Sequence, residues 1–361
     1  MVSVHAVDPT VLVVLSSTQR RGAEVEGATL AAALTESGLA ARVVALGPAV
    51  HGDGLDVEVL GRGGRSPQVW WRLRRLSRHS SVVVAYGSTT LPATALALLG
   101  SRVPWVYRSI GDPAHWAGGR LRRSRTGLLL RRATSVVALW PEAGRDLVAL
   151  YGVAESAIAV IPNSRDPRHF SPSTQEDRCR ARETLGLPAD ALVVAVVGAL
   201  SGEKRPALGI EVVRKIPSAW LVLAGGGPLQ PEVERLAADS LAGRSVVLGP
   251  VGDVRSVLAA ANVVLVCSAT EGMPGVVIEA ALMGRRVVVP AVGACPTMIS
   301  EGLAGALVSA DADAEDVASA VRTQLALADP PPNPAWSLQP AVGRWSALLR
   351  RLAQREVQER L

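Results

Sequence analysis

Short apolar runs alternate with longer amphipathic segments along most of this 361-residue chain. The runs consist mainly of Val, Leu, Ile and Ala, the composition expected of parallel strands that are buried on both faces. A segment of helical length follows nearly every run, as repeated strand–helix units require. The pattern predicts the α/β fold class.

The first series of units begins with a strand at Val11–Leu15, a polar turn that reaches Gly22, and a helix at about residues 23–37. Residues 61–66 predict a loop, and apolar side chains at helical spacing around Trp70 predict a helix after it. Five more strands are predicted in this half, at Arg42–Leu46, Val82–Ala85, Val103–Tyr107, Ser135–Leu139 and Ala159–Ile161. Together these elements describe one Rossmann-like domain.

A polar stretch at Ser164–Ser173, which contains two prolines, interrupts the pattern and predicts an interdomain linker. An Arg-rich helix is predicted from about Pro340 to the end. Between them, strands are predicted at Leu192–Val197, Trp220–Ala224, Ser245–Leu248, Val263–Cys267, Val287–Pro290 and Gly305–Val308. We therefore expect two domains: residues 1–165, completed by a helix at 340–361, and residues 166–339.

The formal net charge of +6 comes almost entirely from arginine, because Lys204 and Lys215 are the only lysines. Fourteen arginines lie between Arg62 and Arg132. Such a cluster is either a set of solvated helix faces or a surface for phosphate, anionic lipid or nucleic acid. Aromatic residues do not interleave with these arginines as a single-strand platform requires, so no nucleic-acid partner is expected. Peripheral contact with an anionic membrane stays a hypothesis.

Cysteine usage and hydropathy bear on location. Cys179, Cys267 and Cys295 are odd in number and far apart, which predicts reduced thiols instead of a disulfide framework. The sequence shows neither a signal-peptide pattern nor an apolar run of about 20 residues. These features predict a soluble cytoplasmic protein, peripheral at the inner membrane face if the arginine surface binds lipid.

Ligands of wound parallel sheets bind beyond the carboxyl ends of the strands, so the loops there are the places for chemistry. After the strand that ends at Cys267, the chain reads SATEGMPGVVIE. Pro274 and Gly275 favour a helix start, whose free N–H groups suit a diphosphate. Glu271 and Glu279 would flank that anion and accept hydrogen bonds from a sugar and a ribose hydroxyl. The alternative is a helix cap with a solvent-exposed glutamate.

Three other loops are candidates. Lys204 and Arg205 follow Gly198 after the first strand of the second series, and paired cations there suit a diphosphate leaving group. The run Gly225–Gly227 lets backbone approach a ligand but lacks the dinucleotide-binding spacing, so a purely structural turn is equally expected. The turn before Gly22 is placed to present amides to a phosphate.

Taken in order, these pieces resemble the retaining glycosyltransferases of family 4, which have the GT-B fold of two Rossmann-like domains facing a cleft. The EX7E element of that family matches Glu271 to Glu279. The passage into the second domain, at Ile161-Pro162-Asn163, also matches the family. So does the later segment with Gly249, Asp253 and Leu258. A third match is the chain end, where Trp336-Ser337 precedes a last helix that crosses back to the first domain.

The resemblance implies transfer of a sugar from a nucleotide-diphosphate sugar to an unidentified glycan, lipid-linked or small-molecule acceptor, with retention and without a metal or other cofactor. By position, Glu271 would contact the donor sugar and stabilise an oxocarbenium-like transition state. Lys204 would bind the diphosphate, and Glu279 the ribose hydroxyls. The other implied donor-side residues are backbone contacts or neighbours of these groups: Gly22, Gly198, Arg205, Gly272, Met273, Pro274, Gly275 and Val276.

The chain departs from the family pattern at three places. The arginine that often precedes the lysine by five residues is Ala199 here, and Arg205 is the expected substitute as second cation. Thr297 stands near the position of a family glutamate. The acceptor-side histidine is absent from the end of the fourth predicted strand, so Asp112 and His115 are the candidates for that side.

Two rival functions stay open on the sequence. A phosphorylase or epimerase on the same architecture would act with free phosphate or without an acceptor. A non-catalytic protein of this fold would only bind a nucleotide sugar or an anionic surface. Asp311-Ala312-Asp313 has the DxD spelling of metal-bound donors in another glycosyltransferase fold. Acidic residues commonly cap a following helix at such a place, so no metal is predicted.

Overall fold

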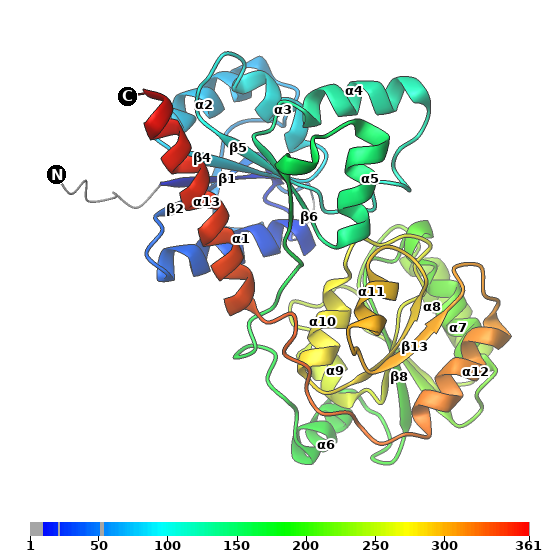
Figure 1. The fold of residues 1–361 in the computed structure, drawn as a ribbon. Coiled ribbons are helices and arrows are strands. Elements are labelled where there is room, and N and C mark those ends of the chain that lie inside the picture. Colours follow the sequence, from blue (N-terminus) through cyan, green and yellow to red (C-terminus); the bar gives the residue numbers. More distant parts are fainter. Residues whose placement is uncertain (1–9, 21, 51–53, 361) are drawn as a thin grey trace. The chain divides into compact units, whose positions relative to one another are not determined.

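The computed structural model describes residues 10–20, 22–50 and 54–360. The chain divides into two compact units: Met1–Asn163 with Gln339–Leu361, and Ser164–Leu338. These limits differ by at most two residues from the domain boundaries expected above. Each unit contains one parallel sheet with helices packed around it (Figure 1). The α/β class, with two Rossmann-like domains, is therefore confirmed.

The first unit holds a seven-stranded parallel sheet in the order β3-β2-β1-β4-β5-β6-β7. Its strands are β1 Val11–Ser17, β2 Ala41–Gly47, β3 Glu58–Val59, β4 Val82–Tyr86, β5 Trp105–Arg108, β6 Ser135–Ala138 and β7 Ile158–Val160. Its helices are α1 Gly22–Glu36, α2 Pro67–Ser77, α3 Thr90–Ala97, α4 Arg120–Leu130, α5 Pro141–Tyr151 and α13 Leu338–Arg360, with a 3-10 turn, η1, at Glu155–Ala157. The strand order reverses beside β1, which pairs with both β2 and β4.

The second unit holds a six-stranded parallel sheet in the order β10-β9-β8-β11-β12-β13. Its strands are β8 Leu192–Val197, β9 Ala219–Ala224, β10 Ser245–Val247, β11 Val263–Leu265, β12 Arg286–Pro290 and β13 Gly305–Val308. Its helices are α6 Gln175–Thr184, α7 Pro206–Arg214, α8 Gln230–Leu241, α9 Arg255–Ala260, α10 Gly275–Leu282, α11 Cys295–Ser300 and α12 Ala314–Leu325, with a 3-10 turn, η2, at Gly202–Lys204. The order reverses between β8 and β11, and ligands of such sheets bind at that switch point.

The central strands of both sheets are buried on both faces, which explains their unbroken apolar sequences. Val13 in β1 and Val84 in β4 are fully buried, as are Val194 in β8 and Val264 in β11. Burying one such side chain contributes about 1.5–3 kcal/mol relative to leaving it exposed. The edge strand β3 is only two residues long and exposed, so no apolar run marks it and the sequence did not predict it.

Most strand limits differ from the predicted ones by one or two residues, and two of these differences have identifiable reasons. β5 begins at Trp105 instead of Val103, because Pro104 has no N–H to donate to the sheet. β11 ends at Leu265 instead of Cys267, because the carbonyl of Cys267 accepts a hydrogen bond from Arg205 Nε at 2.6 Å. Both changes shift the start or end of a strand and leave its sheet position unchanged.

Helix α13 completes the first unit, as the predicted crossing-back helix should (Figure 1). The indole of Trp345, 1% exposed, lies 5.4 Å from the guanidinium carbon of Arg108 at the end of β5. Arg108 Nη2 also donates to Glu26 Oε1 on α1 and to Asn163 Oδ1, each at 2.9 Å. Burial, with the nearby Glu26 carboxylate, raises the pKa of the Tyr86 hydroxyl far above its usual value. This cluster joins α1, the sheet and α13.

Candidate functional site

The loop between β11 and α10 carries the two glutamates that the sequence singled out. Pro274 occupies the N-cap position of α10 with φ −69° and ψ 123°, and Gly275 is the first helical residue. The helix therefore starts where it was predicted to. The N–H groups of its first two residues, Gly275 and Val276, have no intrahelical acceptors, whereas Val277 N donates to the carbonyl of Pro274 at 3.2 Å. Glu271 lies in the loop, and Glu279 lies about one turn inside the helix, where it is 9% exposed.

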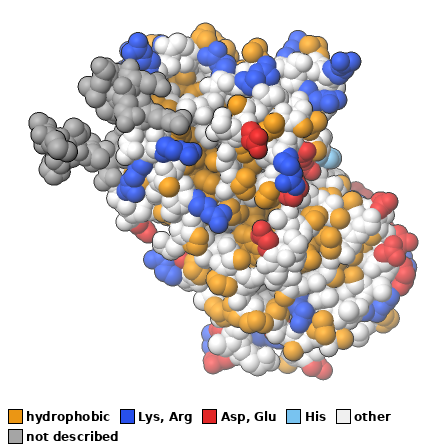
Figure 2. Space-filling view, in the orientation of Figure 1, with side chains coloured by type: hydrophobic (Ala, Val, Ile, Leu, Met, Phe, Trp, Pro, Cys, Tyr) orange, Lys and Arg blue, Asp and Glu red, His pale blue; other side chains and the backbone are white. Residues whose placement is uncertain are grey.

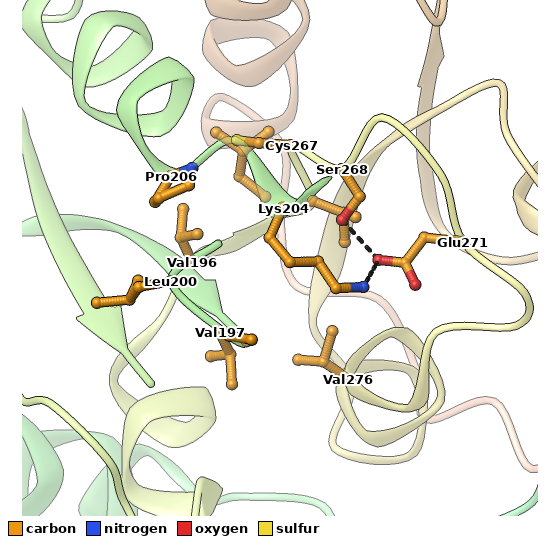
Figure 3. Close-up of a pocket in the computed structure, with 13 residues that line it drawn as sticks. Val196, Val197, Leu200, Lys204, Pro206, Cys267, Ser268, Glu271 and Val276 are labelled. Atoms are coloured by element: carbon orange, nitrogen blue, oxygen red, sulfur yellow. Dashed lines mark hydrogen bonds and ion pairs between the residues drawn. The ribbon is translucent and has the colours of Figure 1, made fainter. Parts of the chain in front are cut away.

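Lys204, Ser268 and Glu271 form a connected polar group at the carboxyl ends of β8 and β11. Lys204 Nζ donates to Glu271 Oε1 at 2.6 Å, and Ser268 Oγ donates to the same oxygen at 2.6 Å. Figure 3 shows the lysine reaching from the β8 side to the glutamate, beside Val197 and Val276. The Lys204 side chain is 32% exposed and that of Glu271 11%. A cation and a carboxylate thus meet beside the start of α10.

A pocket opens on this group at the switch point of the sheet. Its lining comes from the end of β8, the loop after it, the end of β11 and the first turn of α10. The lining residues are Val196, Val197, Gly198, Ala199, Leu200, Lys204, Pro206, Leu265, Val266, Cys267, Ser268, Glu271 and Val276. The structure therefore brings four of the predicted donor-side residues, Gly198, Lys204, Glu271 and Val276, to one pocket.

Arg205 has a different place from the one expected of a second cation for the diphosphate. Its backbone is left-handed, with φ 46°, at the junction between η2 and α7. Its guanidinium donates to the carbonyl oxygens of Cys267, at 2.6 Å, and Ser268, at 3.2 Å. Since these bonds tie the β8 loop to the β11 loop, Arg205 holds the two halves of the site together. It does not line the pocket with Lys204.

The glycine run after β9 serves the backbone. A Cβ on Gly225 would lie 1.8 Å from the carbonyl oxygen of Gly198, and a Cβ on Gly227 would lie 2.4 Å from that of Leu200. Leu200 N also donates to the carbonyl of Gly226 at 3.0 Å. Of the two interpretations left open by the sequence, the structure supports the structural turn: these glycines let the β9 loop pack against the β8 loop.

The loop after β12 supports the glutamate from the other side. Gly293 has φ 55°, and a Cβ there would lie 2.2 Å from the carbonyl oxygen of Glu271. Ala294 N donates to the carbonyl of Gly272 at 2.8 Å. Burial, with the nearby Glu271 carboxylate, raises the pKa of the Cys295 thiol to about 12. The segment Glu271–Gly272 is therefore fixed by backbone contacts. Thr297 lies on α11, and a role for it stays a prediction.

Arg165 belongs to the site and was missed by the sequence analysis. Its Nε donates to Glu279 Oε1 at 2.7 Å, and the two side chains are 17% and 11% exposed. A Cβ on Gly275 would lie 2.0 Å from Arg165 Nη2, so the guanidinium lies directly against the first turn of α10. The polar stretch around Arg165 was interpreted as a linker, and nothing in the sequence distinguishes Arg165 from Arg168 in the same stretch.

Of the remaining predicted residues, Met273 belongs to the loop between β11 and α10, and Gly22, Asp112 and His115 belong to the first unit. Met273 is buried, at 5% exposed. Gly22 is the exposed first residue of α1, and Arg21 before it lies outside the described residues. Asp112 Oδ1 accepts from Ala114 N at 2.9 Å and caps a turn. His115 is exposed, with its ring 4.9 Å from that of Trp116. The roles of Gly22, Asp112 and His115 stay predictions.

The acidic triplet at Asp311–Asp313 is explained by helix capping. Asp313 is the N-cap of α12, and its Oδ1 accepts hydrogen bonds from Glu315 N at 2.8 Å and Asp316 N at 2.9 Å. The Asp311 carboxylate accepts from the Ser309 hydroxyl, which lowers the pKa of Asp311. Within the described ranges, no group of three or more His, Cys, Asp or Glu is arranged to hold a metal ion.

Two family models match the chain, one in each unit. Residues 10–164 match the glycosyl transferase 4-like domain. Residues 191–326 match the glycosyl transferases group 1. The D-inositol 3-phosphate glycosyltransferase of Mycobacterium tuberculosis is 34% identical over 173 residues, which are 46% of this chain and 35% of that protein. The matched segment thus spans about a third of the length of these curated relatives.

Solved structures resemble the chain over nearly its whole length. The Anabaena protein HepE, in complex with UDP and glucose, has a TM-score of 0.76 and 19% identity over 96% of this chain and 95% of that one. Sucrose-phosphate synthase from Thermosynechococcus elongatus has a TM-score of 0.70 and 19% identity, over 97% and 98%. These likenesses show the GT-B fold, and the two family models together show that the chain belongs to the family 4-like glycosyltransferases.

Proposed function

We propose that the protein is a retaining glycosyltransferase that takes its sugar from a nucleotide-diphosphate sugar. The observation that carries this proposal is the Lys204–Glu271 pair at the switch point, beside the free N–H groups of α10. A cation and a helix start attract a diphosphate, and a carboxylate next to them accepts hydrogen bonds from a sugar. The complexes of HepE with UDP and with UDP-glucose support the same class of donor.

Each residue then has a step in the transfer. The bond between the anomeric carbon and the diphosphate oxygen breaks, and a bond from that carbon to the acceptor oxygen forms on the same face. The acceptor proton goes to the leaving phosphate. Lys204 and the first amides of α10 stabilise the charge on the diphosphate, while Glu271 stabilises the positive charge that develops on the sugar. In the free protein, Glu271 holds Lys204 in place at 2.6 Å.

Glu279 is proposed to accept hydrogen bonds from the ribose hydroxyls of the donor. Its Oε1 already accepts from Arg165, and a carboxylate has further lone pairs for hydroxyl groups. Gly22 at the start of α1 is proposed to present its amide to a phosphate, and Asp112 and His115 to face the acceptor. The acceptor class is also a proposal. Polyol phosphates belong in the first panel of acceptors to be tested, because the mycobacterial relatives are named for an inositol phosphate.

The first experiment is a thermal-shift titration of the chain with UDP, GDP, ADP and TDP. One nucleotide should raise the melting temperature. At a concentration of 100 times its Kd, a ligand adds about 2.7 kcal/mol to the free energy of unfolding. Glu279→Ala should weaken that effect, whereas Glu234→Ala, an exposed glutamate on α8, serves as the matched control. If none of the four nucleotides stabilises the wild-type chain, the transferase proposal is wrong and a binding protein for other anions takes its place.

A second measurement separates the enzyme from its rivals. The selected UDP-sugar or other nucleotide sugar is incubated with the acceptor panel, and the anomeric configuration of the product is read by NMR. A transferase gives a product with the configuration of the donor. Turnover only with inorganic phosphate would indicate a phosphorylase, and change of the sugar without any acceptor an epimerase.

We also propose that helix α4 contacts an anionic membrane. Leu121 and Leu128 are 66% and 60% exposed on one side of the helix, next to the exposed Arg125, and Arg122 is exposed on the same helix. The sequence has no acidic residue from 113 to 141. Figure 2 shows Arg side chains over α4 with hydrophobic atoms between them. Exposed apolar and basic side chains on one helix suit the surface of a membrane.

Some other arginines of the cluster donate to backbone carbonyls, among them two on α2. On α2, Arg72 Nη1 donates to the carbonyl of Leu60 at 2.7 Å, and Arg74 Nη1 donates to that of Leu99 at 2.7 Å. No helix in the described part of the chain is long and apolar enough to cross a membrane. The membrane proposal therefore concerns the surface of α4.

Flotation with vesicles tests this contact. Vesicles of phosphatidylcholine with phosphatidylglycerol should carry the wild-type chain, and vesicles of phosphatidylcholine alone should not. The double variant Leu121→Ser with Leu128→Ser should lose binding, whereas Leu327→Ser, exposed in the second unit, should keep it. Absence of wild-type binding to the anionic vesicles would sink the membrane proposal and leave the transferase proposal intact.

A further inference from the structure

The donor site has lost one expected cation and gained another. The family pattern often places an arginine five residues before the lysine, where this chain has Ala199. Arg205, the expected substitute, is bonded to the carbonyl oxygens of Cys267 and Ser268. Lys204 is therefore the only Lys or Arg among the residues that line the described pocket. A nucleoside diphosphate carries at least two negative charges, so the site calls for a further positive group.

Arg165 supplies such a group at the adjoining turn of α10. Its Nη2 lies against Gly275, and the next residue, Val276, lines the pocket with Lys204. Nε donates to Glu279 and Nη1 to the carbonyl of Ser164, while Nη2 has no hydrogen-bond acceptor among the described residues. The one free end of the guanidinium is thus the end that faces the helix start.

The position of Arg165 is fixed from both ends. Its backbone N donates to the carbonyl of Trp336 at 3.1 Å, and it pairs with Ser337 in an isolated parallel bridge. The Glu279 carboxylate holds the side chain at 2.7 Å. A guanidinium that is already oriented loses little rotamer freedom when an anion arrives, which favours binding.

We infer that Arg165 is the second cation of the donor site and binds the diphosphate of the nucleotide through Nη2. The inference rests on the proposed function and adds a residue to it. Glu279 then has two tasks, because the same carboxylate that accepts from the ribose also aims Arg165 at the phosphates. Gly275 is required at the helix start, since a Cβ there would meet the guanidinium at 2.0 Å.

The experiment compares a ligand that has phosphates with one that lacks them. The Kd of UDP and, by competition, that of uridine are measured for wild type, Arg165→Ala and Arg165→Lys, or the same pair for whichever base the nucleotide screen selects. Arg165→Ala should weaken UDP about 10- to 100-fold, the range of a charge-assisted hydrogen bond, and uridine less than about 3-fold. Arg165→Lys should restore most of the UDP affinity.

The controls separate this role from a structural one. Arg168→Ala removes an arginine three residues away that is 72% exposed and paired with Asp166, and it should leave both Kd values unchanged. Melting temperatures without ligand show whether each variant is folded. If Arg165→Ala weakens UDP and uridine in the same ratio, Arg165 only holds Glu279 and the inference is wrong. Unchanged UDP affinity would overturn it too.

Failure of the inference and failure of the proposed function look different. If wild type binds none of the four nucleotides, both are wrong. If wild type binds one nucleotide and the Arg165 variants bind it equally well, only the role of Arg165 is wrong.

Discussion

The two units each contain an arginine paired with a largely buried glutamate, but the two pairs differ in what surrounds them. In the first unit, Arg108 is 0% exposed and Glu26 9%, and the guanidinium is enclosed by Asn163, Ile161 and the Trp345 ring. In the second unit, Arg165 and Glu279 are 17% and 11% exposed, and Arg165 Nη2 lacks an acceptor among the described residues.

The difference shows how an ion pair that supports the fold can be distinguished from one that can also bind a ligand. A charge enclosed on all sides can only contribute to the fold, because no ligand reaches it and its removal leaves its partner uncompensated. A pair with free donors and partial exposure beside a pocket has bonds left to give to a ligand. Exposure carries this distinction, since the pairwise distances of 2.9 Å and 2.7 Å are similar and the enclosed Arg108 Nε also has no hydrogen-bond partner among the described residues.

The largest expected effect comes from breaking the enclosed pair. Arg108→Ala should lower the free energy of unfolding by about 3–5 kcal/mol, because Glu26 would stay buried without its cation. Differential scanning calorimetry measures the loss as a lower melting temperature. Arg102→Ala, an exposed arginine in the same region, is the control. A loss below about 1 kcal/mol would show that the enclosed pair does not hold the unit together.

The next effect concerns activity in the open site. Glu271→Gln and Lys204→Ala should each lower kcat for release of the nucleotide from the donor sugar about 10²- to 10³-fold, as expected for loss of a charged group that stabilises the transition state. The melting temperature without ligand should change little, since Lys204 is 32% exposed. Full activity in Glu271→Gln would remove the carboxylate from the proposed mechanism.

A smaller effect is expected at the contact between Gly275 and Arg165. Gly275→Ala should leave the fold intact, because alanine is a better helix former by about 1 kcal/mol and the guanidinium end can move away. The displaced Arg165 should weaken UDP binding several-fold, which isothermal calorimetry measures. Gly343→Ala, where nothing lies within 4 Å of the added Cβ, should have no effect on binding. Equal UDP affinity in both variants would contradict the contact.

The smallest effect concerns the two buried thiols beneath the site. Burial raises the pKa of Cys267 and of Cys295 to about 12. At pH 8 about one in 10⁴ of these thiols is ionised, so a disulfide reagent should label only the exposed Cys179 in the native chain. The raised pKa also means that the two thiols stabilise the fold below pH 9 and that this contribution falls as pH rises toward 12. Rapid labelling of more than one thiol at pH 8 would contradict their burial.

Much of the fold could be predicted from the local sequence. Continuous apolar runs identified the central strands because both of their faces are covered by helices, as at β8 and β11. Pro274 and Gly275 identified the start of α10 because proline and glycine have strong backbone preferences. Strand limits were less readable: β11 ends where Arg205, 62 residues before Cys267, takes the Cys267 carbonyl.

The candidate site could be predicted only in part, because some of its contacts join residues that lie far apart in the sequence. The sequence singled out Lys204, Glu271 and Glu279 because each follows a strand or lies at a helix start in a pattern that resembles a known family, and their roles stay predictions. Arg165 was missed because its partners, Gly275 and Glu279, lie 110 and 114 residues further along the chain. The sequence analysis assigned Arg205 to the diphosphate from its charge and its position after a strand. The sequence does not show that its guanidinium donates to the carbonyls of Cys267 and Ser268.

The sequence by itself determined the α/β class, the two-domain division, the helix start at Gly275 and the identity of the charged groups, since these depend on residue type and short-range spacing. Only the tertiary structure decided which arginine is enclosed, which is bonded to backbone and which keeps a free donor beside the pocket. A guanidinium has five N–H groups and a long side chain, so its role depends on the acceptors that the folded chain brings within reach.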